Sequence, residues 1–287
     1  GSVHGARVRC TDCHPGMQEV PHPERTFKDA AAFRAAFTDT CKRCHFDKYT
    51  KLVDGVHYRL LPQGEAPGCI DCHGAHDVTR ARAPRTRVSE TCATCHADVG
   101  ETYAASVHGQ ALAAGRGEDV PVCTDCHRSH DVAGPHDQGW LVRTPQMCGG
   151  CHADEQRMKK YGLSTAVLRT YLSDFHGMTA SLSPAANQGD RRLTALCTDC
   201  HGVHDIAKVT DPGSGVLREN LARTCSKCHG GATANFPAAW LSHYEPSWEK
   251  APLVHGVTLF YKVLIPFMIG GLVLQILLHL WRVVVNR

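Results

Sequence analysis

The strongest constraint on the fold of this chain is a five-residue pattern, Cys-x-x-Cys-His, which occurs eight times between Cys10 and His229. The eight copies use all sixteen cysteines, so no cysteine remains for another role. A histidine follows every second cysteine, although histidine occupies only 20 of the 287 positions. In chain order, sites 1 to 8 comprise Cys10, Cys13 and His14; Cys41, Cys44 and His45; Cys69, Cys72 and His73; Cys92, Cys95 and His96; Cys123, Cys126 and His127; Cys148, Cys151 and His152; Cys197, Cys200 and His201; and Cys225, Cys228 and His229.

The spacing within the pattern indicates covalent attachment of haem c. Two thiols three residues apart on a helical turn can both form thioether bonds to the vinyl groups of one haem, and the adjacent imidazole then lies below the iron as the proximal ligand. Four Cys₄ zinc sites or a disulfide scaffold would use the cysteines equally well, but they leave the eight histidines unexplained. The sequence therefore predicts eight covalently bound haem c groups in a domain outside the cytoplasm, where such attachment is completed.

The composition agrees with a core built from cofactors. Leu, Ile, Val and Phe are sparse over the first 250 residues, so side chains alone would leave the interior of a domain of this length underfilled. We expect a mostly irregular, haem-packed fold with short α-helices and no convincing strand, including helices over residues 25–37 and from Ser89 to Tyr103. The formal charge of +3 gives no indication of nucleic-acid binding.

The eight sites alternate between two forms and define a repeat. Odd-numbered sites read Cys-[Thr/Ile]-Asp-Cys-His, and three of them carry a further histidine at the third position after the motif: His76, His130 and His204. A short segment with its own histidine recurs ahead of each pair of sites, at His4, His57, His108 and His176. The sequence thus predicts four tandem two-haem units, which form an octahaem domain over residues 1–245.

Eight irons require eight distal ligands from the twelve remaining histidines. Each third-position histidine is too close in sequence to reach the iron of its own site, so we expect it to bind a neighbouring haem, while the repeated segments supply four more ligands. The first unit has Met17 at the third position, and His22 is the expected substitute, with His243 and Met17 as alternatives. The predicted distal set is His4, His22, His57, His76, His108, His130, His176 and His204. Bis-histidine coordination favours low reduction potentials and leaves no open iron.

A separate apolar segment follows the haem domain. After a linker over residues 246–256, the 25 residues from Val257 to Trp281 contain one formal charge, Lys262, and predict a single transmembrane helix. Arg282 and Arg287 follow it, so we expect a cytoplasmic tail over residues 282–287. His255 and His279 lie near opposite ends of the span, where a haem b or a quinone could contact them. Since one helix offers few walls for a quinone pocket, we expect a partner subunit to bind the quinone.

The motifs resemble the multihaem cytochrome c superfamily, in particular its periplasmic low-potential members that exchange electrons with membrane quinone-linked complexes. Residues 255–279 also resemble the first membrane helix of cytochrome b-type subunits. The resemblance implies closely spaced parallel and perpendicular haem pairs. All eight motifs end in His, so the lysine-ligated signature of the multihaem nitrite reductases is absent.

The expected function is that of a membrane-anchored conduit in a respiratory or photosynthetic chain. It would relay single electrons between a membrane partner, either quinone-linked or of cytochrome b type, and a periplasmic electron carrier. We expect it to be an electron-transfer subunit of an oxidoreductase complex more than a self-contained enzyme. A multihaem reductase of a small nitrogen or sulfur oxyanion, with one under-ligated haem, is an alternative, and a quinol dehydrogenase is another. With Gly1 first and no secretion signal, we expect the sequence to start within or at the beginning of a mature chain.

Overall fold

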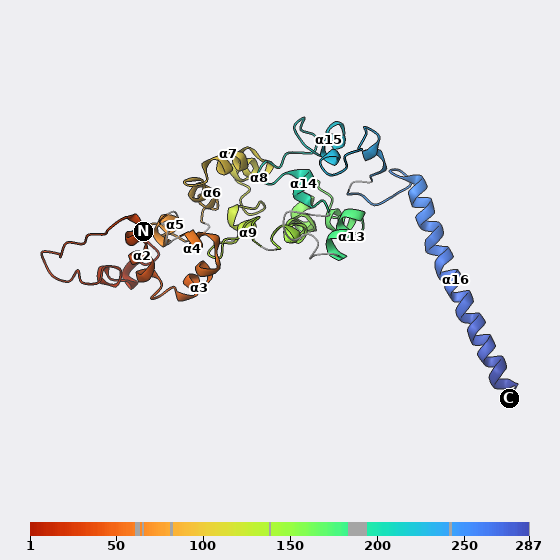
Figure 1. The fold of residues 1–287 in the computed structure, drawn as a ribbon, viewed down its shortest axis with the longest axis horizontal. Helices are drawn as coiled ribbons and strands as arrows, with labels where there is room; N and C mark the ends of the chain where they lie inside the picture. Colours follow the sequence, from red (N-terminus) through yellow and green to blue (C-terminus); the bar gives the residue numbers. More distant parts are fainter. Residues whose placement is uncertain are drawn as a thin grey trace.

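Short helices joined by loops make up most of the molecule. The computed structural model describes residues 1–60, 64, 66–80, 83–137, 139–182, 194–240 and 243–286. Within these ranges no residue forms a strand, as the sequence predicted. The units follow one another along an elongated body that ends in one long helix (Figure 1).

The odd-numbered sites lie on helices of about one turn, which are α1 (Cys10–Cys13), α5 (Cys69–His73), α9 (Cys123–His127) and α14 (Cys197–His201). The aspartate of each motif accepts a hydrogen bond from the backbone N–H of the residue before the helix, at 2.7 to 2.8 Å. A helix this short leaves nearly all of its N–H groups without an internal partner. The aspartate therefore closes the N-terminus of each odd site, which explains why the motif carries it.

The even-numbered sites lie at the ends of longer helices. These are α2 (Ala30–Cys41), α6 (Thr86–Ala93), α10 (Thr144–His152) and α15 (Leu221–Ser226), and the chain continues from the first three into α3 (Phe46–Asp54), α7 (Ala97–Ala105) and α11 (Glu155–Met158). The helix expected from Ser89 to Tyr103 is divided into α6 and α7, because His96 takes a non-helical conformation at φ −108° and ψ 57°. The helix expected over residues 25–37 begins at Ala30, where the Asp29 side chain caps it.

The repeated histidine segments form the next set of elements, η1 (Gly5–Arg7), α4 (Val56–Leu60), α8 (Val107–Ala113) and α13 (Phe175–Leu182). Ser106 and Asp174 cap the last two, since their side-chain oxygens accept hydrogen bonds from the N–H groups of Gly109 and Gly177 at 3.1 and 2.9 Å. Short connecting turns complete the domain at α12 (Val167–Leu172), η3 (Leu141–Arg143), η4 (Lys159–Tyr161), η6 (Arg218–Asn220) and η7 (Phe236–Ala239).

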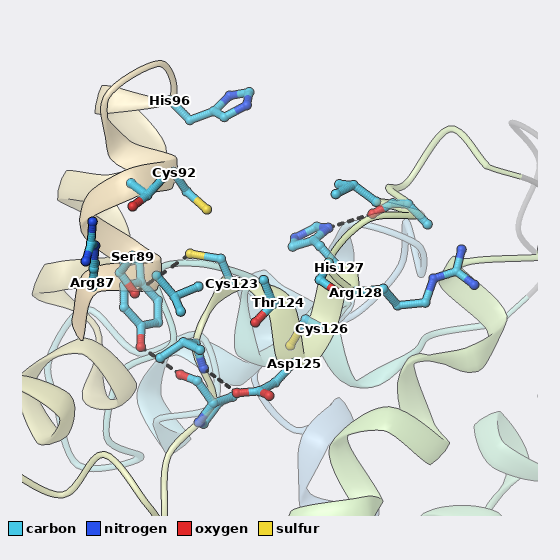
Figure 2. A pocket seen from close by; sticks show the side chains of 18 of the residues that line it. Arg87, Ser89, Cys92, His96, Cys123, Thr124, Asp125, Cys126, His127 and Arg128 are labelled. Atoms are coloured by element: carbon cyan, nitrogen blue, oxygen red, sulfur yellow. Dashed lines mark hydrogen bonds between the residues drawn. The ribbon is translucent and has the colours of Figure 1, made fainter. Parts of the chain in front are cut away.

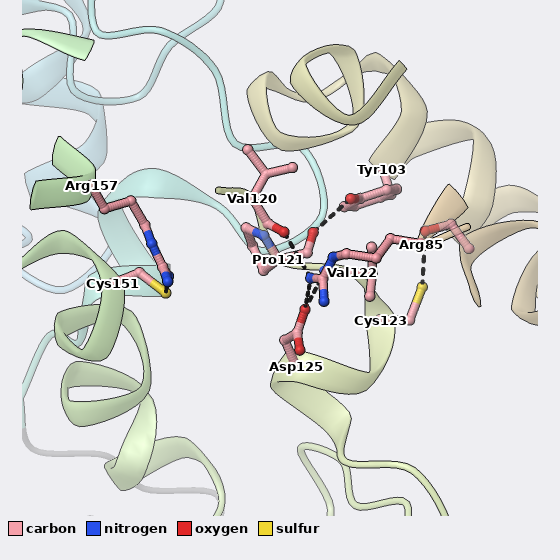
Figure 3. A network of polar contacts seen from close by, with 10 residues as sticks. Arg85, Tyr103, Val120, Pro121, Val122, Cys123, Asp125, Cys151 and Arg157 are labelled. Atoms are coloured by element: carbon pink, nitrogen blue, oxygen red, sulfur yellow. Dashed lines mark hydrogen bonds and ion pairs between the residues drawn. The ribbon is translucent and has the colours of Figure 1, made fainter. Parts of the chain in front are cut away.

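The same links join successive units. The residue ahead of each of the first three repeated histidines donates its backbone N–H to the carbonyl two residues beyond a third-position histidine: Val3 to Val78, Val56 to Val132 and Val107 to Ile206, at 2.7, 2.9 and 2.9 Å. An arginine ahead of two even sites also pairs with the capping aspartate of the next odd site, as Arg34–Asp71 and Arg85–Asp125. Figure 3 shows the second of these pairs. These contacts thus recur at equivalent positions of the sequence repeat.

Apolar side chains form only a small core of their own. Leu112, Val120 and Val122 are buried together, and Val88 and Tyr103 pack against them. A cavity of about 2600 Å³ runs through the domain and is lined by motif cysteines and histidines of sites 1 to 7. This arrangement fits a domain whose core is completed by a bound group.

The long helix α16 (Pro252–Val285) has 34 residues and is long and apolar enough to cross a membrane. At 1.5 Å per residue it extends about 51 Å, more than the hydrocarbon thickness of a bilayer. It begins at Pro252 and not at Val257, because proline suits the first helical position, and it continues through Pro266. Part of the expected linker over residues 246–256 is therefore helical.

The close approach of α7 and α8 generates a prediction about stability. A Cβ atom at Gly109 would lie 2.1 Å from the carbonyl oxygen of Tyr103, so Gly109→Ala forces the two helices apart. We expect a loss of about 1–3 kcal/mol in the free energy of unfolding. Thermal unfolding measures this loss of stability. Gly213→Ala is the control, because a Cβ atom at Gly213 meets no atom within 4 Å. Equal melting temperatures for the two variants would contradict this packing.

Candidate haem-binding site

Each motif histidine faces one other histidine across a gap. Ring centroids at the odd sites are 6.0 Å apart for His14–His76, 5.9 Å for His73–His130, 5.9 Å for His127–His204 and 6.2 Å for His201–His243. At the even sites they are 6.1 Å apart for His45–His4, 6.2 Å for His96–His57, 6.3 Å for His152–His108 and 6.3 Å for His229–His176. No histidine occurs in two of these pairs.

The gap between the paired rings has the size of one metal ion. A metal–imidazole bond is about 2 Å long, and the bound nitrogen lies about 1 Å from the centre of its ring, so two imidazoles on opposite sides of one iron have centroids about 6 Å apart. The eight observed separations all lie within 0.3 Å of this value. The pairs are therefore spaced to hold an iron between them.

The pairing follows one rule along the chain. Each even site receives its second histidine from the repeated segment ahead of its own unit. Sites 1, 3 and 5 instead receive theirs from the third-position histidine of the following unit. Every unit is thus tied to the next by an imidazole as well as by backbone hydrogen bonds.

The structure differs from the expected distal set at one position, His22. This residue lies on an exposed loop, where its Nδ1 is 2.9 Å from the carbonyl oxygen of Glu19, and it is paired with no motif histidine. Its expected place in the set is taken by His243, which faces His201. The reason lies in the pairing rule. The third-position histidine of a unit faces the odd site of the preceding unit. No unit precedes the first, so no histidine is needed in place of Met17. No unit follows the last, so its odd site is faced by His243, which lies beyond the repeats.

Neighbouring sites contact one another through their cysteines. The thiols of Cys41 and Cys69, of Cys92 and Cys123, and of Cys148 and Cys197 lie close enough to shift each other's pKa, and these contacts join each even site to the next odd site. Figure 2 shows the Cys92 and Cys123 sulfurs close together between α6 and α9. Within the units, thiols are near enough to interact electrostatically at Cys13 and Cys41, Cys72 and Cys95, Cys126 and Cys148, and Cys200 and Cys225. The eight sites form a single file in chain order.

Burial keeps many of these imidazoles in the form that binds metals. It lowers the pKa of His108 to about 4, because the imidazolium is poorly solvated inside the protein. Burial is also the largest cause that lowers the pKa of His57, His73, His130, His152, His201, His204 and His243. At His127, the carbonyl of Ala133 lies 2.8 Å from Nδ1 and accepts a hydrogen bond from it, which leaves Nε2 for the metal.

The residues present fit haem c and not the other uses of the cysteines. All sixteen cysteines are free thiols, and no group of three or more metal-binding side chains forms among the described residues. The buried indole Nε1–H of Trp240 has no hydrogen-bond partner, and this ring packs edge-on against His243 at 6.0 Å. A haem carries propionate oxygens that could accept such a bond. The paired thiols, paired imidazoles and shared cavity define a c-type cytochrome with several haems.

Comparisons with known proteins agree with this class. A family model for cytochrome c3 matches residues 63–153. The multiheme cytochrome MtrA of Shewanella baltica (strain OS185) is 26% identical over 209 residues, which cover 70% of this chain and 50% of the relative. The chain thus spans about half the length of this curated relative. No solved structure matches. Both matches support a place for the chain in the multihaem cytochrome c superfamily and indicate covalently bound haem c.

Two recurring contacts escaped the sequence analysis. Tyr103 and Tyr171, each five residues ahead of a repeated histidine, donate their hydroxyls to the carbonyls of Pro121 and Ala195 at 2.7 and 3.0 Å. Thr38 and Ser89 accept hydrogen bonds from the thiols of Cys69 and Cys123 at 3.8 Å. Both could have been found from the repeat, because each residue type recurs at a fixed distance from a motif or from a repeated histidine.

Replacement of His243 separates it from His22 as a ligand. His243→Ala removes the imidazole that faces His201, so one haem of the set is expected to become high-spin, while His22→Ala leaves every haem low-spin. Optical and electron paramagnetic resonance (EPR) spectra of the oxidised holoprotein measure the difference. The reverse result would return His22 to the distal set.

Proposed function

We propose that the chain is a membrane-anchored octahaem cytochrome c that relays single electrons along a file of eight bis-histidine haems. The observation that supports this function best is that every motif histidine faces a second histidine at the spacing of one iron. The distal set of the proposal is His4, His57, His76, His108, His130, His176, His204 and His243. The unit of organisation is the two-haem repeat.

Each part of the site has a role in electron transfer. Haem supplies the reversible one-electron chemistry. The two histidines of each site would hold the iron and leave no open position for a small substrate, and two imidazoles would favour a low reduction potential. The cysteines fix the position of each haem, and the contacts between cysteines of successive sites keep neighbouring haems close. Burial in an apolar cavity limits the rearrangement of solvent when the charge changes.

The placement of the two ends suggests which partners the file connects. Site 1 lies at the end of the body far from α16, and the last residues of the haem domain lead directly into α16 (Figure 1). We propose that residues 1–245 lie in the periplasm, that α16 crosses the membrane and that Arg282 and the residues after it lie in the cytoplasm. Electrons would then pass between a membrane redox subunit, such as a cytochrome b-like protein, and a periplasmic carrier.

A reductase of a small oxyanion is the weaker candidate. That activity needs an iron with an open position, for example at sites 1 and 8, the first and last of the file. Both sites have a facing imidazole, from His76 and His176 respectively. The geometry therefore favours a role in electron transfer and gives less support to the reduction of nitrite, hydroxylamine or tetrathionate.

The experiment that tests the conduit uses the full-length holoprotein in lipid nanodiscs. We expect dithionite to reduce all eight haems, with low-spin spectra in both redox states, and we expect no consumption of nitrite, hydroxylamine or tetrathionate by the reduced protein. Stopped-flow absorbance follows the haems, and ion chromatography follows the oxyanions. A high-spin haem together with oxyanion consumption would replace the conduit with a reductase.

The facing imidazoles form two groups by the angle between their planes. The angle is 21° to 27° at sites 1, 3, 4, 5 and 7, and 51° to 55° at sites 2, 6 and 8. Each imidazole donates π-electron density perpendicular to its plane, so the angle sets how strongly the iron d orbitals are split. Two spectroscopic groups of iron sites follow from this difference.

Low-temperature EPR of the oxidised protein checks the two groups. The five sites with nearly parallel planes are expected to give resolved rhombic low-spin signals, and the three more crossed sites a broader feature at lower field. The integrated intensities should stand near five to three. A single group of eight equivalent signals would contradict the geometry.

A further inference from the structure

The motif histidine of site 5, His127, is held on two sides. It exchanges two hydrogen bonds with Ala133, since the N–H of Ala133 donates to the carbonyl of His127 at 2.9 Å and Nδ1–H of His127 donates to the carbonyl of Ala133 at 2.8 Å. Figure 2 shows the second of these bonds. The indole of Trp140 stacks on the imidazole, with ring centroids 5.3 Å apart and an angle of 12° between the planes. Ala133 and Trp140 are only 3% and 5% exposed, so this support is shielded from water.

The turn that supplies the carbonyl is itself fixed. The Asp137 side chain accepts a hydrogen bond from the N–H of Gly134 at 2.8 Å and pairs with Arg59 of α4 at 2.7 Å. In the part of the chain that the structure describes, no hydrogen bond engages a ring nitrogen of the other seven motif histidines. Site 5 therefore differs from the other sites in how its motif imidazole is supported.

A hydrogen bond donated from Nδ1 changes the imidazole as a ligand. The carbonyl acceptor makes the ring more basic, so Nε2 becomes a stronger donor to a metal. A stronger donor stabilises ferric iron over ferrous iron and lowers the reduction potential. The arginines paired at this motif add little positive charge to oppose the effect, because Arg85 and Arg128 are each bound to a carboxylate, Asp125 and Asp131.

Site 6, the next in the file, has the opposite environment. The guanidinium of Arg157, on α11, donates from Nη1 to the sulfur of Cys151 at 2.8 Å (Figure 3). This sulfur is one of the two that would be bonded to the haem of site 6, so the positive charge lies at the edge of that haem. Within the described residues Arg157 forms no ion pair.

The carboxylates around Arg157 are engaged elsewhere. Asp119 is bound through both oxygens by Lys160 at 2.9 and 3.0 Å, and it accepts a hydrogen bond from the Tyr161 hydroxyl at 3.0 Å. The Asp154 side chain caps α11 by accepting a hydrogen bond from the backbone N–H of Arg157 at 3.1 Å. The guanidinium charge is therefore available to act on site 6. It favours the ferrous state, which carries one positive charge less than the ferric state.

Sites 5 and 6 are neighbours, so the two environments act on the same transfer. Cys126 of site 5 is near enough to interact electrostatically with Cys148 and Cys151 of site 6. The helices α14 and α15, which carry sites 7 and 8, lie between α9 and α16 (Figure 1). The path from site 5 through site 6 therefore leads towards α16.

We propose that the support of His127 by Ala133 and Trp140, together with the guanidinium of Arg157, sets a step in reduction potential between sites 5 and 6. The proposal rests on the proposed electron-transfer function and names residues that divide the file. One electron leaves the ferrous iron of site 5 and reduces the ferric iron of site 6, and no proton is taken up or released. This transfer is downhill, so in partly reduced protein electrons accumulate at site 6 in preference to site 5.

The first test replaces Arg157 in the full-length holoprotein in nanodiscs. Arg157→Gln keeps a hydrogen-bond donor and removes the charge, whereas Arg157→Lys keeps the charge. We expect Arg157→Gln to make one haem of the eight about tenfold harder to reduce, a shift of 59 mV to lower potential, and Arg157→Lys to stay within threefold of wild type. Redox potentiometry followed by EPR measures the shift. The shifted haem should belong to the more crossed group, because the imidazole planes of site 6 are 51° apart.

Arg143→Gln is the matched control for this pair. Arg143 is exposed at the start of α10, so its replacement makes the same change in net charge away from Cys151. We expect it to leave the potential of every haem within threefold of wild type.

The second test replaces Trp140. Trp140→Leu removes the ring that stacks on His127 and should make one haem about fivefold easier to reduce, while Trp140→Phe keeps a ring and should stay nearer to wild type. This haem should belong to the nearly parallel group, because the imidazole planes of site 5 are 25° apart. Trp248→Leu, which removes an indole packed against His255, is the control. Thermal unfolding reports any loss of packing separately, and the Arg157 pair carries the test by itself where Trp140→Leu lowers the haem content.

The two tests contradict the proposal in distinct ways. It is overturned if Arg157→Gln leaves all potentials unchanged, if the two replacements shift a haem in the same direction, or if a shift falls in the other spectroscopic group. In each of these outcomes, eight low-spin haems that dithionite reduces leave the conduit standing. A high-spin haem in the wild-type protein would instead overturn the proposed function and the step with it.

Discussion

The distance between two imidazoles on opposite sides of one iron is the constraint on which this structure depends. Each of the eight motif histidines meets a second histidine at a ring separation of 5.9 to 6.3 Å, although the partners come from separate parts of the chain. Loops, one-turn helices and backbone hydrogen bonds between units all serve this requirement. A conventional core is small, which fits a domain whose interior is completed by bound haem.

Local chemistry positions each partner within this arrangement. A capping aspartate stabilises each attachment helix at the odd sites, and Ser106 or Asp174 starts the helix that carries a distal histidine. Glycines allow these helices to approach the preceding ones within a distance that no other side chain permits. The precision of the file thus comes from many short polar contacts, each repeated from unit to unit, and not from a large apolar interior.

Much of this could be predicted from the sequence, because covalent chemistry fixes the spacing of the motif residues. The cofactor class, the absence of strands in the described residues and the apolar C-terminal helix all followed from local patterns. The place of His243, and not His22, opposite His201 did not follow from local patterns. It depends on which neighbouring unit each third-position histidine faces, and no local spacing shows this. The packing of Trp248 against Gly256 and His255 was also out of reach, because no spacing in the chain predicts that contact.

The register of the odd sites has a consequence for how such a protein is made. An exported chain would emerge from its N-terminus, and the histidine that faces His14 of site 1 is His76, which belongs to the next unit. Under the proposed coordination, a haem attached at an odd site would gain its second ligand only after the following unit had been exported. His243, which faces His201, would supply that ligand at the last odd site.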